Sequence, residues 1–484
     1  MRAPIAKTSA VVVLVCATLV VIAALNAATT TGAAAGPNQQ KPWDQILGPS
    51  QGTLPPPRKG LETTIELPTL RKEVARTSIK WETDLAEAMR IAKAENRPIF
   101  VTFRCLPCKS CSEFDKTVLE GGPDLNPLFQ QFVTLRLTGT QDVDLRILRM
   151  SEFQDMDVSW WSWFLSPEGK IYGVFGGRDK SGDQGRTSKQ SLIMTMNRVL
   201  AHHYDPRRMG WDVDGTLPDL ASKRVTPVTL PGFDNWLKHR GNAEGYKTQG
   251  CVHCHQASEI MRQGEIDLGQ FDKNRDLGIW PFPENIGAVV DRDDGLKLTK
   301  VIDPSPAARI ALKPGDVLAA ADGRRLFSQA DFRAVLHRAA KTGPTQINLH
   351  WLRDGKVMSG TLVLDGDWRA TDLTWRASVV GGNIGAFPGF WANDAGVMRQ
   401  RLELPADTMA IKPYIGPKQV TGPAYVAGLR ATDIVTSVNG ETRNMQPGEF
   451  LVWFRKKFEP GDEITLTVRN DSGKVREVKY KAER

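Results

Sequence analysis

The sequence contains no run of five or six consecutive lysines or arginines, so a basic arm that binds nucleic acid is not expected. Its 63 Lys and Arg against 55 Asp and Glu give a net charge of +8, a mild excess over 484 residues. The hydrophobic share of 41% and the charged share of 24% are those of globular protein, which excludes a disordered chain and a multi-span membrane protein. At roughly 100–200 residues per domain, this length predicts about three or four domains.

A long apolar run occurs at the start of the chain. Arg2 and Lys7 precede residues 10–25, in which only Thr18 is not apolar. A positive start followed by a short apolar core is typical of a secretory signal, since a spanning helix needs about 20 apolar residues. We therefore expect a signal peptide over residues 1–27 and a periplasmic or otherwise exported protein. The alternative is a membrane anchor formed by an uncleaved signal.

Cysteine is scarce, and its distribution is uneven. The chain has six cysteines, and the five that follow the apolar segment fall into two short clusters. A small secreted scaffold held by disulfides would have a denser and more even distribution. The clusters therefore indicate redox chemistry or a bound metal.

The first cluster lies within an α/β pattern. Residues 98–103 read as a buried strand, residues 132–137 as a second strand, residues 163–175 as a hairpin and residues 188–203 as a closing helix. Cys105 and Cys108 follow the first strand at the start of a helix, where the helix dipole favours a thiolate. Cys108, one turn on, can resolve a mixed disulfide, and Cys111 is a further candidate. A structural disulfide and a metal site are the alternatives.

This α/β pattern resembles the thioredoxin fold over residues 78–210, and the resemblance implies a catalytic role for Cys105. Two positions depart from it. Arg104 stands where thioredoxins have Trp before the first Cys, and Trp160 lies near the expected place of the cis-Pro that faces the thiols.

The second cluster reads Cys251-Val-His-Cys254-His255 and matches the C-x-x-C-H pattern of haem c attachment. Two thiols at this spacing can bind the haem vinyl groups covalently, and His255 can reach the iron. Zinc bound by the same residues, or a plain disulfide, are the alternatives. We expect a small, mostly irregular or helical segment here.

The last third of the chain contains an internal repeat. Residues 305–323 and 422–440 share Pro, Ala, Leu, Asp and Gly at a fixed offset of 117 residues. Both copies resemble PDZ domains, which bind an extended peptide and hold its C-terminal carboxylate on backbone N–H groups. The resemblance places the peptide-binding loop of the first copy at Ile286, Gly287, Ala288 and Val289. In the second copy we expect this loop at residues 407–411.

The order of these parts resembles a bacterial family of thioredoxin-like/PDZ-domain (seleno)proteins. The expected fold is multidomain, with an α/β thioredoxin-like domain, a C-x-x-C-H segment and two α+β, barrel-like PDZ domains. The expected function is an exported thiol–disulfide redox protein with haem c, whose PDZ domains bind peptide C-termini of a partner. The alternatives are a PDZ adaptor with a structural thioredoxin-like domain and a monohaem electron carrier. The expected boundaries are signal peptide 1–27, flexible linker 28–77, thioredoxin-like domain 78–210, C-x-x-C-H segment 211–285, first PDZ domain 286–366, Trp/Arg linker 367–406 and second PDZ domain 407–484.

Overall fold

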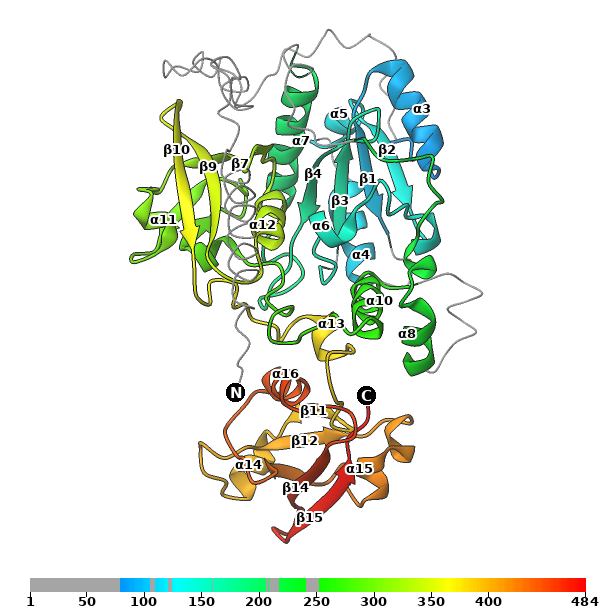
Figure 1. The fold of residues 1–484 in the computed structure, drawn as a ribbon, viewed down its shortest axis with the longest axis vertical. Coiled ribbons are helices and arrows are strands. Elements are labelled where there is room, and N and C mark those ends of the chain that lie inside the picture. The colour runs from blue at the N-terminus through cyan, green and yellow to red at the C-terminus, as the bar shows by residue number, and fades with distance from the viewer. Residues whose placement is uncertain are drawn as a thin grey trace, which may run out of the picture.

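A computed structural model describes residues 79–104, 109–120, 124–158, 160–205, 208, 217–240 and 252–484 (Figure 1). The expected signal peptide and linker lie outside these ranges. Within the described part of the chain, no helix is long and apolar enough to cross a membrane.

The first domain is a four-stranded sheet in the order β2-β1-β3-β4, in which β1 and β2 are parallel and the other neighbours antiparallel. The strand residues are almost all buried, because helices cover both faces. Helix α3 packs in the core on one face, and α7 packs in the core on the other. The elements are α3 (Leu85–Glu95), β1 (Ile99–Phe103), α4 (Lys109–Phe114), the π-helical turn η1 (Asp115–Leu119), α5 (Asn126–Phe129), β2 (Val133–Leu137), η2 (Thr140–Asp142), α6 (Met150–Phe153), β3 (Trp161–Leu165), β4 (Ile171–Gly176) and α7 (Lys189–His203).

The segment that encloses the second cysteine cluster consists, where it is described, of helices joined by irregular stretches. Its elements are η4 (Pro227–Thr229), α8 (Phe233–Arg240) and α10 (Cys254–Asp267). A Cβ on Gly232 would collide with the backbone of α10, so glycine permits the close approach. Trp236 and Ile260 lie in a small core between the two helices.

The first repeat forms a sheet in the order β10-β9-β7-β8 together with the strand pair β5-β6. Strands β9 and β10 form a hairpin at Arg353-Asp-Gly-Lys356, whose tight turn has positive φ at Asp354 and Gly355. The elements are η5 (Pro283–Ile286), β5 (Ala288–Val290), β6 (Leu298–Val301), α11 (Pro306–Arg309), β7 (Val317–Ala321), β8 (Arg324–Arg325), α12 (Gln329–Arg338), β9 (Thr345–Arg353) and β10 (Lys356–Leu364).

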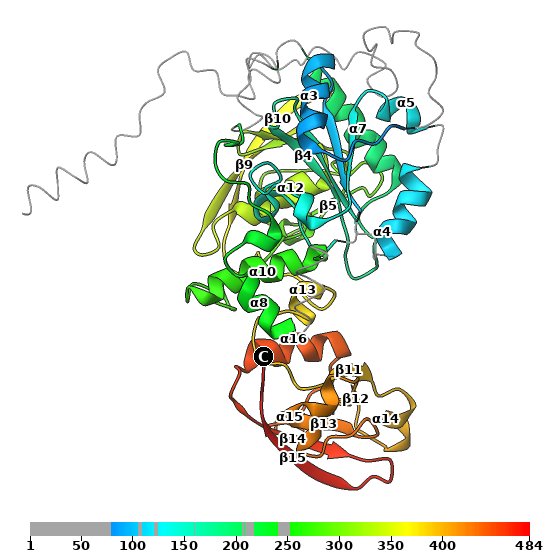
Figure 2. The same cartoon turned by 90° about the vertical axis from the view of Figure 1, so that its right-hand side faces the viewer.

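The C-terminal module repeats this element order in a five-stranded sheet, β11-β12-β13-β14-β15. We expected it to begin at residue 407, but β11 pairs with β12, so the module already includes residues of the expected Trp/Arg linker. Figure 2 shows this module below the other two, with α16 facing α13. The elements are α13 (Ala377–Val380), β11 (Trp391–Asp394), α14 (Val397–Arg401), β12 (Ile411–Tyr414), η6 (Gln419–Thr421), α15 (Pro423–Val426), β13 (Ile434–Val438), α16 (Pro447–Lys457), β14 (Glu463–Arg469) and β15 (Val475–Lys481).

Candidate functional site

The first cysteine cluster belongs to a strand-to-helix junction. Strand β1 ends at Phe103 and α4 begins at Lys109. Cys105 and Cys108 lie in between, outside the described residues, and Cys111 lies in α4. The backbone N–H of Arg104 donates to the carbonyl of Leu137 at the end of β2, which ties the start of the junction to the sheet.

A buried carboxylate with two guanidinium groups supports this junction. Asp115 is almost fully buried, with Arg136 Nη2 at 3.0 Å and Arg104 Nε at 3.2 Å from its carboxylate oxygens. Burial raises the pKa of the Asp115 carboxyl, and the two arginines oppose that shift. Arg104 also donates to Ser112 Oγ in α4 at 3.1 Å. A fixed positive charge therefore stands directly before the first cysteine.

Trp160, near the expected place of the cis-Pro, is part of the core. Its indole N–H donates to Thr102 Oγ1 at 3.1 Å, and its ring stacks on Phe114 at 4.0 Å between centroids. A buried, stacked tryptophan therefore lies near the place at which the resemblance predicts the cis-Pro of a thioredoxin substrate groove.

The second cluster docks at the end of the same sheet. The N–H of Val252 donates to Thr140 Oγ1 in η2, just after β2, at 3.1 Å. Cys254 opens α10, and its sulfur accepts a hydrogen bond from Trp161 Nε1 at 3.3 Å. Trp161 stacks in parallel on Phe103, the last residue of β1, at 5.2 Å. The start of α10 and the junction that leads to Cys105 thus share one end of the sheet. Cys251 lies outside the described residues.

His255 is held in an orientation that suits a metal ligand. Its Nδ1 lies 3.1 Å from Glu259 Oε1, one turn along α10, and the other oxygen of this buried carboxylate accepts from Trp236 Nε1 at 2.8 Å. A carboxylate on Nδ1 fixes the ring and leaves Nε2 for a metal. The residues therefore fit a role of His255 as an iron ligand. Within the described ranges, no group of three or more His, Cys, Asp and Glu side chains is placed to hold a metal ion.

The predicted peptide-binding loop of the first repeat leads into β5. Ile286 and Ala288 are buried, and Val289 is partly exposed. Gly287 has φ 84°, and a Cβ there would collide with the Ser305 side chain, so only glycine fits. Its carbonyl accepts from the N–H of Ile302, which fixes the loop against β6.

The expected loop of the second repeat, residues 407–411, is wrong for this role, because it leads into β12, the counterpart of β6. Strand β11 is the counterpart of β5, since it pairs with β12 as β5 pairs with β6. The segment before β11 begins Asn383-Ile-Gly-Ala386 and repeats Asn285-Ile-Gly-Ala288. This signal was present in the sequence, but the two segments are 98 residues apart and not 117, because the second copy carries extra residues around α14.

A cavity of about 170 Å³ lies at this second loop. Ile384 and Gly385 line it from the loop, and Lys273 and Arg484 add positive charge. Lys273 is also fixed to the module, since its Nζ lies 2.6 Å from Glu459 Oε1 and donates to two carbonyls at the end of α16.

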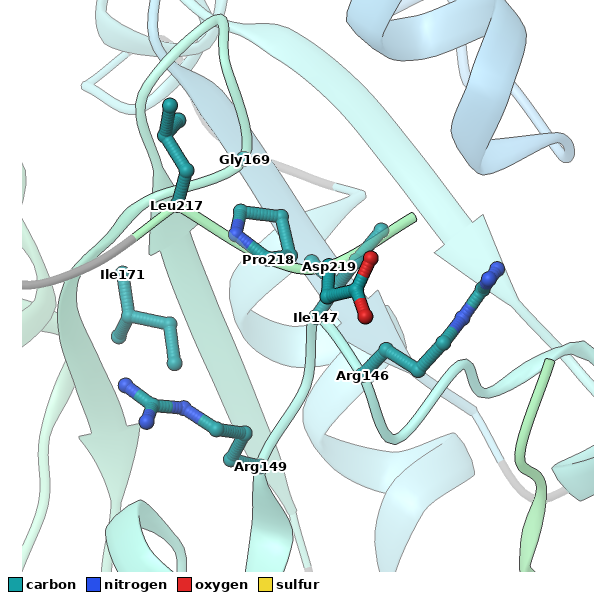
Figure 3. Close-up of a pocket in the computed structure, with 8 residues that line it drawn as sticks. All are labelled: Arg146, Ile147, Arg149, Gly169, Ile171, Leu217, Pro218 and Asp219. Atoms are coloured by element: carbon teal, nitrogen blue, oxygen red, sulfur yellow. The ribbon is translucent and has the colours of Figure 1, made fainter. Parts of the chain in front are cut away.

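A second cavity, of about 160 Å³, is remote from the predicted site residues (Figure 3). Gly169 and Ile171 line it from the hairpin between β3 and β4, and Arg146 and Arg149 line it from the stretch before α6. The hairpin lies at the opposite end of the sheet from the cysteine junction, because β3 runs antiparallel to β1. This cavity therefore has no part in a thiol site.

Comparison with known proteins agrees with this architecture. Residues 80–154 match a family model described as thioredoxin-like, and residues 285–363 match one described as a PDZ domain. The chain therefore contains a thioredoxin-like domain followed by a PDZ domain. Two curated relatives are each described as a probable periplasmic serine endoprotease DegP-like.

The relative from Pseudomonas savastanoi pv. phaseolicola (strain 1448A / Race 6) is 26% identical over 194 residues. The relative from Pseudomonas fulva (strain 12-X) is 26% identical over 197 residues. Each match covers 38% of this chain and 37% of the relative, so the chain spans little more than a third of these proteins.

Proposed function

We propose that the chain is an exported thiol–disulfide redox protein whose PDZ modules bind peptide C-termini of its partner. The observation that carries the redox part is the junction between β1 and α4, where Arg104, fixed by Asp115 and Ser112, places positive charge before Cys105. The PDZ match supports peptide binding, and the periplasmic relatives support export.

The proposed reaction is a thiol–disulfide exchange in which the reduced Cys105–Cys108 pair reduces a disulfide of the partner. The Cys105 thiolate attacks a disulfide of the partner, forms a mixed disulfide and releases one partner sulfur as a thiolate. Cys108 then attacks Cys105, which frees the second partner sulfur and leaves a Cys105–Cys108 disulfide. Two electrons pass to the partner, and the reverse sequence oxidises it. Cys111 is an alternative resolving thiol.

The redox proposal is tested by alkylation of the reduced protein at pH 6 to 7, with rates measured separately for Cys105 and Cys111. Cys105 should react faster than Cys111, and Arg104→Gln should slow it about three- to tenfold, since a nearby cation favours the thiolate. Arg90→Gln, an exposed change on α3, is the control and should leave both rates unchanged. Equal rates at Cys105 and Cys111 would favour the adaptor function. The buried Trp160 near the expected place of the cis-Pro supports that alternative.

We further propose that Cys251, Cys254 and His255 hold a c-type haem, with zinc as the alternative. A bound haem would supply one-electron transfer. The proposal is supported by the C-x-x-C-H spacing and by Glu259, which holds the His255 ring through Nδ1.

Intact mass after expression with haem-c maturation tests the haem. The expected result is a gain of one haem, with alkylation restricted to Cys105, Cys108 and Cys111. Glu259→Gln should then change the ligand-sensitive absorption bands, whereas Glu265→Gln on the same helix should not. A protein without haem, with Cys251 and Cys254 open to alkylation, would contradict haem and leave zinc to be measured by metal analysis.

A further inference from the structure

A peptide groove of the PDZ type would lie between β5 and α12, which form its two walls. In such modules a peptide adds as a strand beside the loop strand and beneath the helix. The two walls are adjacent here at both ends. A Cβ on Gly295, which follows β5, would lie 3.4 Å from the N–H nitrogen of Gln329 at the start of α12. Near the other end, the N–H of Trp280 donates to His337 Nδ1 at 3.2 Å.

The chain on both sides of β5 is bound to the thioredoxin-like domain. At the loop, Arg186 Nη1 lies 2.5 Å from Glu284 Oε1. Just after β5, Arg292 Nε donates to the carbonyl of Thr187 at 3.1 Å. Beyond it, Arg198 Nη2 lies 2.6 Å from Asp294 Oδ1.

The α12 wall is bound to the same domain. Ser328 Oγ donates to the carbonyl of Val174, and the N–H of Val174 donates to Asp331 Oδ1 at 2.7 Å. Val174 belongs to β4, an edge strand, so the start of α12 caps an otherwise open sheet edge. Phe327 and Ala330 lie within the hydrophobic cores of the thioredoxin-like domain. Figure 1 shows α12 between β4 and the sheet of its own module.

One continuous stretch of the thioredoxin-like domain, residues 174–198, therefore contacts both walls. Arg198 joins them directly, because it pairs with Asp294 on the β5 side and donates to the carbonyl of Phe327, beside α12, at 3.3 Å. A peptide strand inserted between β5 and α12 would meet this stretch.

We infer that the thioredoxin-like domain closes the peptide groove of the first PDZ module, so that a partner peptide binds there only after the two domains separate. The inference rests on the proposed peptide-binding function of this module. Only open molecules bind peptide, so the apparent affinity is the intrinsic affinity multiplied by the fraction of molecules that are open. Peptide binding and separation of the redox domain are therefore linked, and each favours the other.

Hydrogen exchange on the full chain tests closure without any peptide. Arg186→Glu with Arg198→Glu reverses two charges at the rim of the groove. Each such ion pair shifts the equilibrium toward the closed state by a factor of roughly two to five. The variant loses both pairs and adds repulsion, so hydrogen exchange at Ala288–Val290 should rise at least about tenfold. Lys189→Glu is the matched control, because Lys189 pairs with Asp124 inside the thioredoxin-like domain. Unchanged exchange in a folded double variant would overturn the inference.

The fold of the double variant is checked by slow exchange in β1 and β9, and the milder Arg198→Gln should shift β5 in the same direction. A short fluorescein-labelled peptide with a C-terminal valine is then added. Protection of β5 in the double variant, but weak protection in the wild type, supports closure. Equal protection in both would overturn it. Faster β5 exchange without protection by this peptide would leave closure standing and count against peptide binding by the module.

Discussion

Single side chains show how the packing between domains fixes protonation states. His337, at the end of α12, stacks on Trp280 at 3.9 Å between centroids and accepts its backbone N–H. Burial, with the Arg369 guanidinium nearby, lowers the pKa of His337 to about 3. In the unfolded chain a histidine, with a pKa near 6.5, becomes charged as the pH falls below that value. In the folded protein the His337 ring stays neutral over the same pH range.

This depressed pKa predicts a loss of stability in acid. Between pH 6.5 and pH 3 the unfolded chain binds a proton at His337 and the folded chain does not, so stability falls as the pH falls. The contribution is about 1–2 kcal/mol between pH 7 and pH 5. Urea unfolding at both pH values should show a smaller pH effect in His337→Gln, which keeps an acceptor for Trp280. The same pH effect in wild type and variant would contradict the assignment.

At the scale of helices and strands, the sequence predicted what depends on local patterns. The buried strand before Cys105, the hairpin of β3 and β4 and the closing helix α7 all occur, because hydrophobic runs and turn residues specify them locally. The repeat predicted that the C-terminal module shares the element order of the first. It misplaced the second loop, because a fixed offset does not account for the extra residues around α14.

For the candidate site, too, the sequence predicted the local features and missed those that depend on packing. Spacing pointed to the two cysteine clusters, and the resemblance to PDZ domains pointed to the loop around Gly287. It did not predict that Trp161 links Cys254 to Phe103, or that Glu259 orients His255, because these contacts depend on how helices pack on the sheet. The sequence also did not predict that Asp331 and Arg333 of α12 are buried against the thioredoxin-like domain, whereas Arg338 on the same helix is exposed.

Across the whole molecule, a buried ionic cluster joins parts that are distant in sequence. Asp155, before β3, lies 2.6 Å from Arg333 of α12 and 2.9 Å from Arg376, which precedes α13. The two guanidinium groups hold the pKa of Asp155 at about 2 although burial opposes this. Arg376 also contacts Asp157, whose carboxylate accepts from the backbone and side chain of Ser378. The thioredoxin-like domain, the first PDZ module and the following linker therefore share one fully desolvated set of charges.

This cluster predicts that the thioredoxin-like domain and the first PDZ module unfold as one unit. Asp155→Asn leaves Arg333 and Arg376 buried with too little negative charge, which should cost about 3–5 kcal/mol. Hydrogen exchange in increasing urea should show β1 and β9 opening together and at lower urea than in the wild type. Strands β14 and β15, in a separate core, should open at an unchanged urea concentration. Glu87→Gln, which removes an exposed pair on α3, should leave stability almost unchanged, because solvent screens such a pair. Separate opening of β1 and β9 in the wild type would show that the cluster does not couple the two domains, and an equal shift in β14 would show that it couples all three.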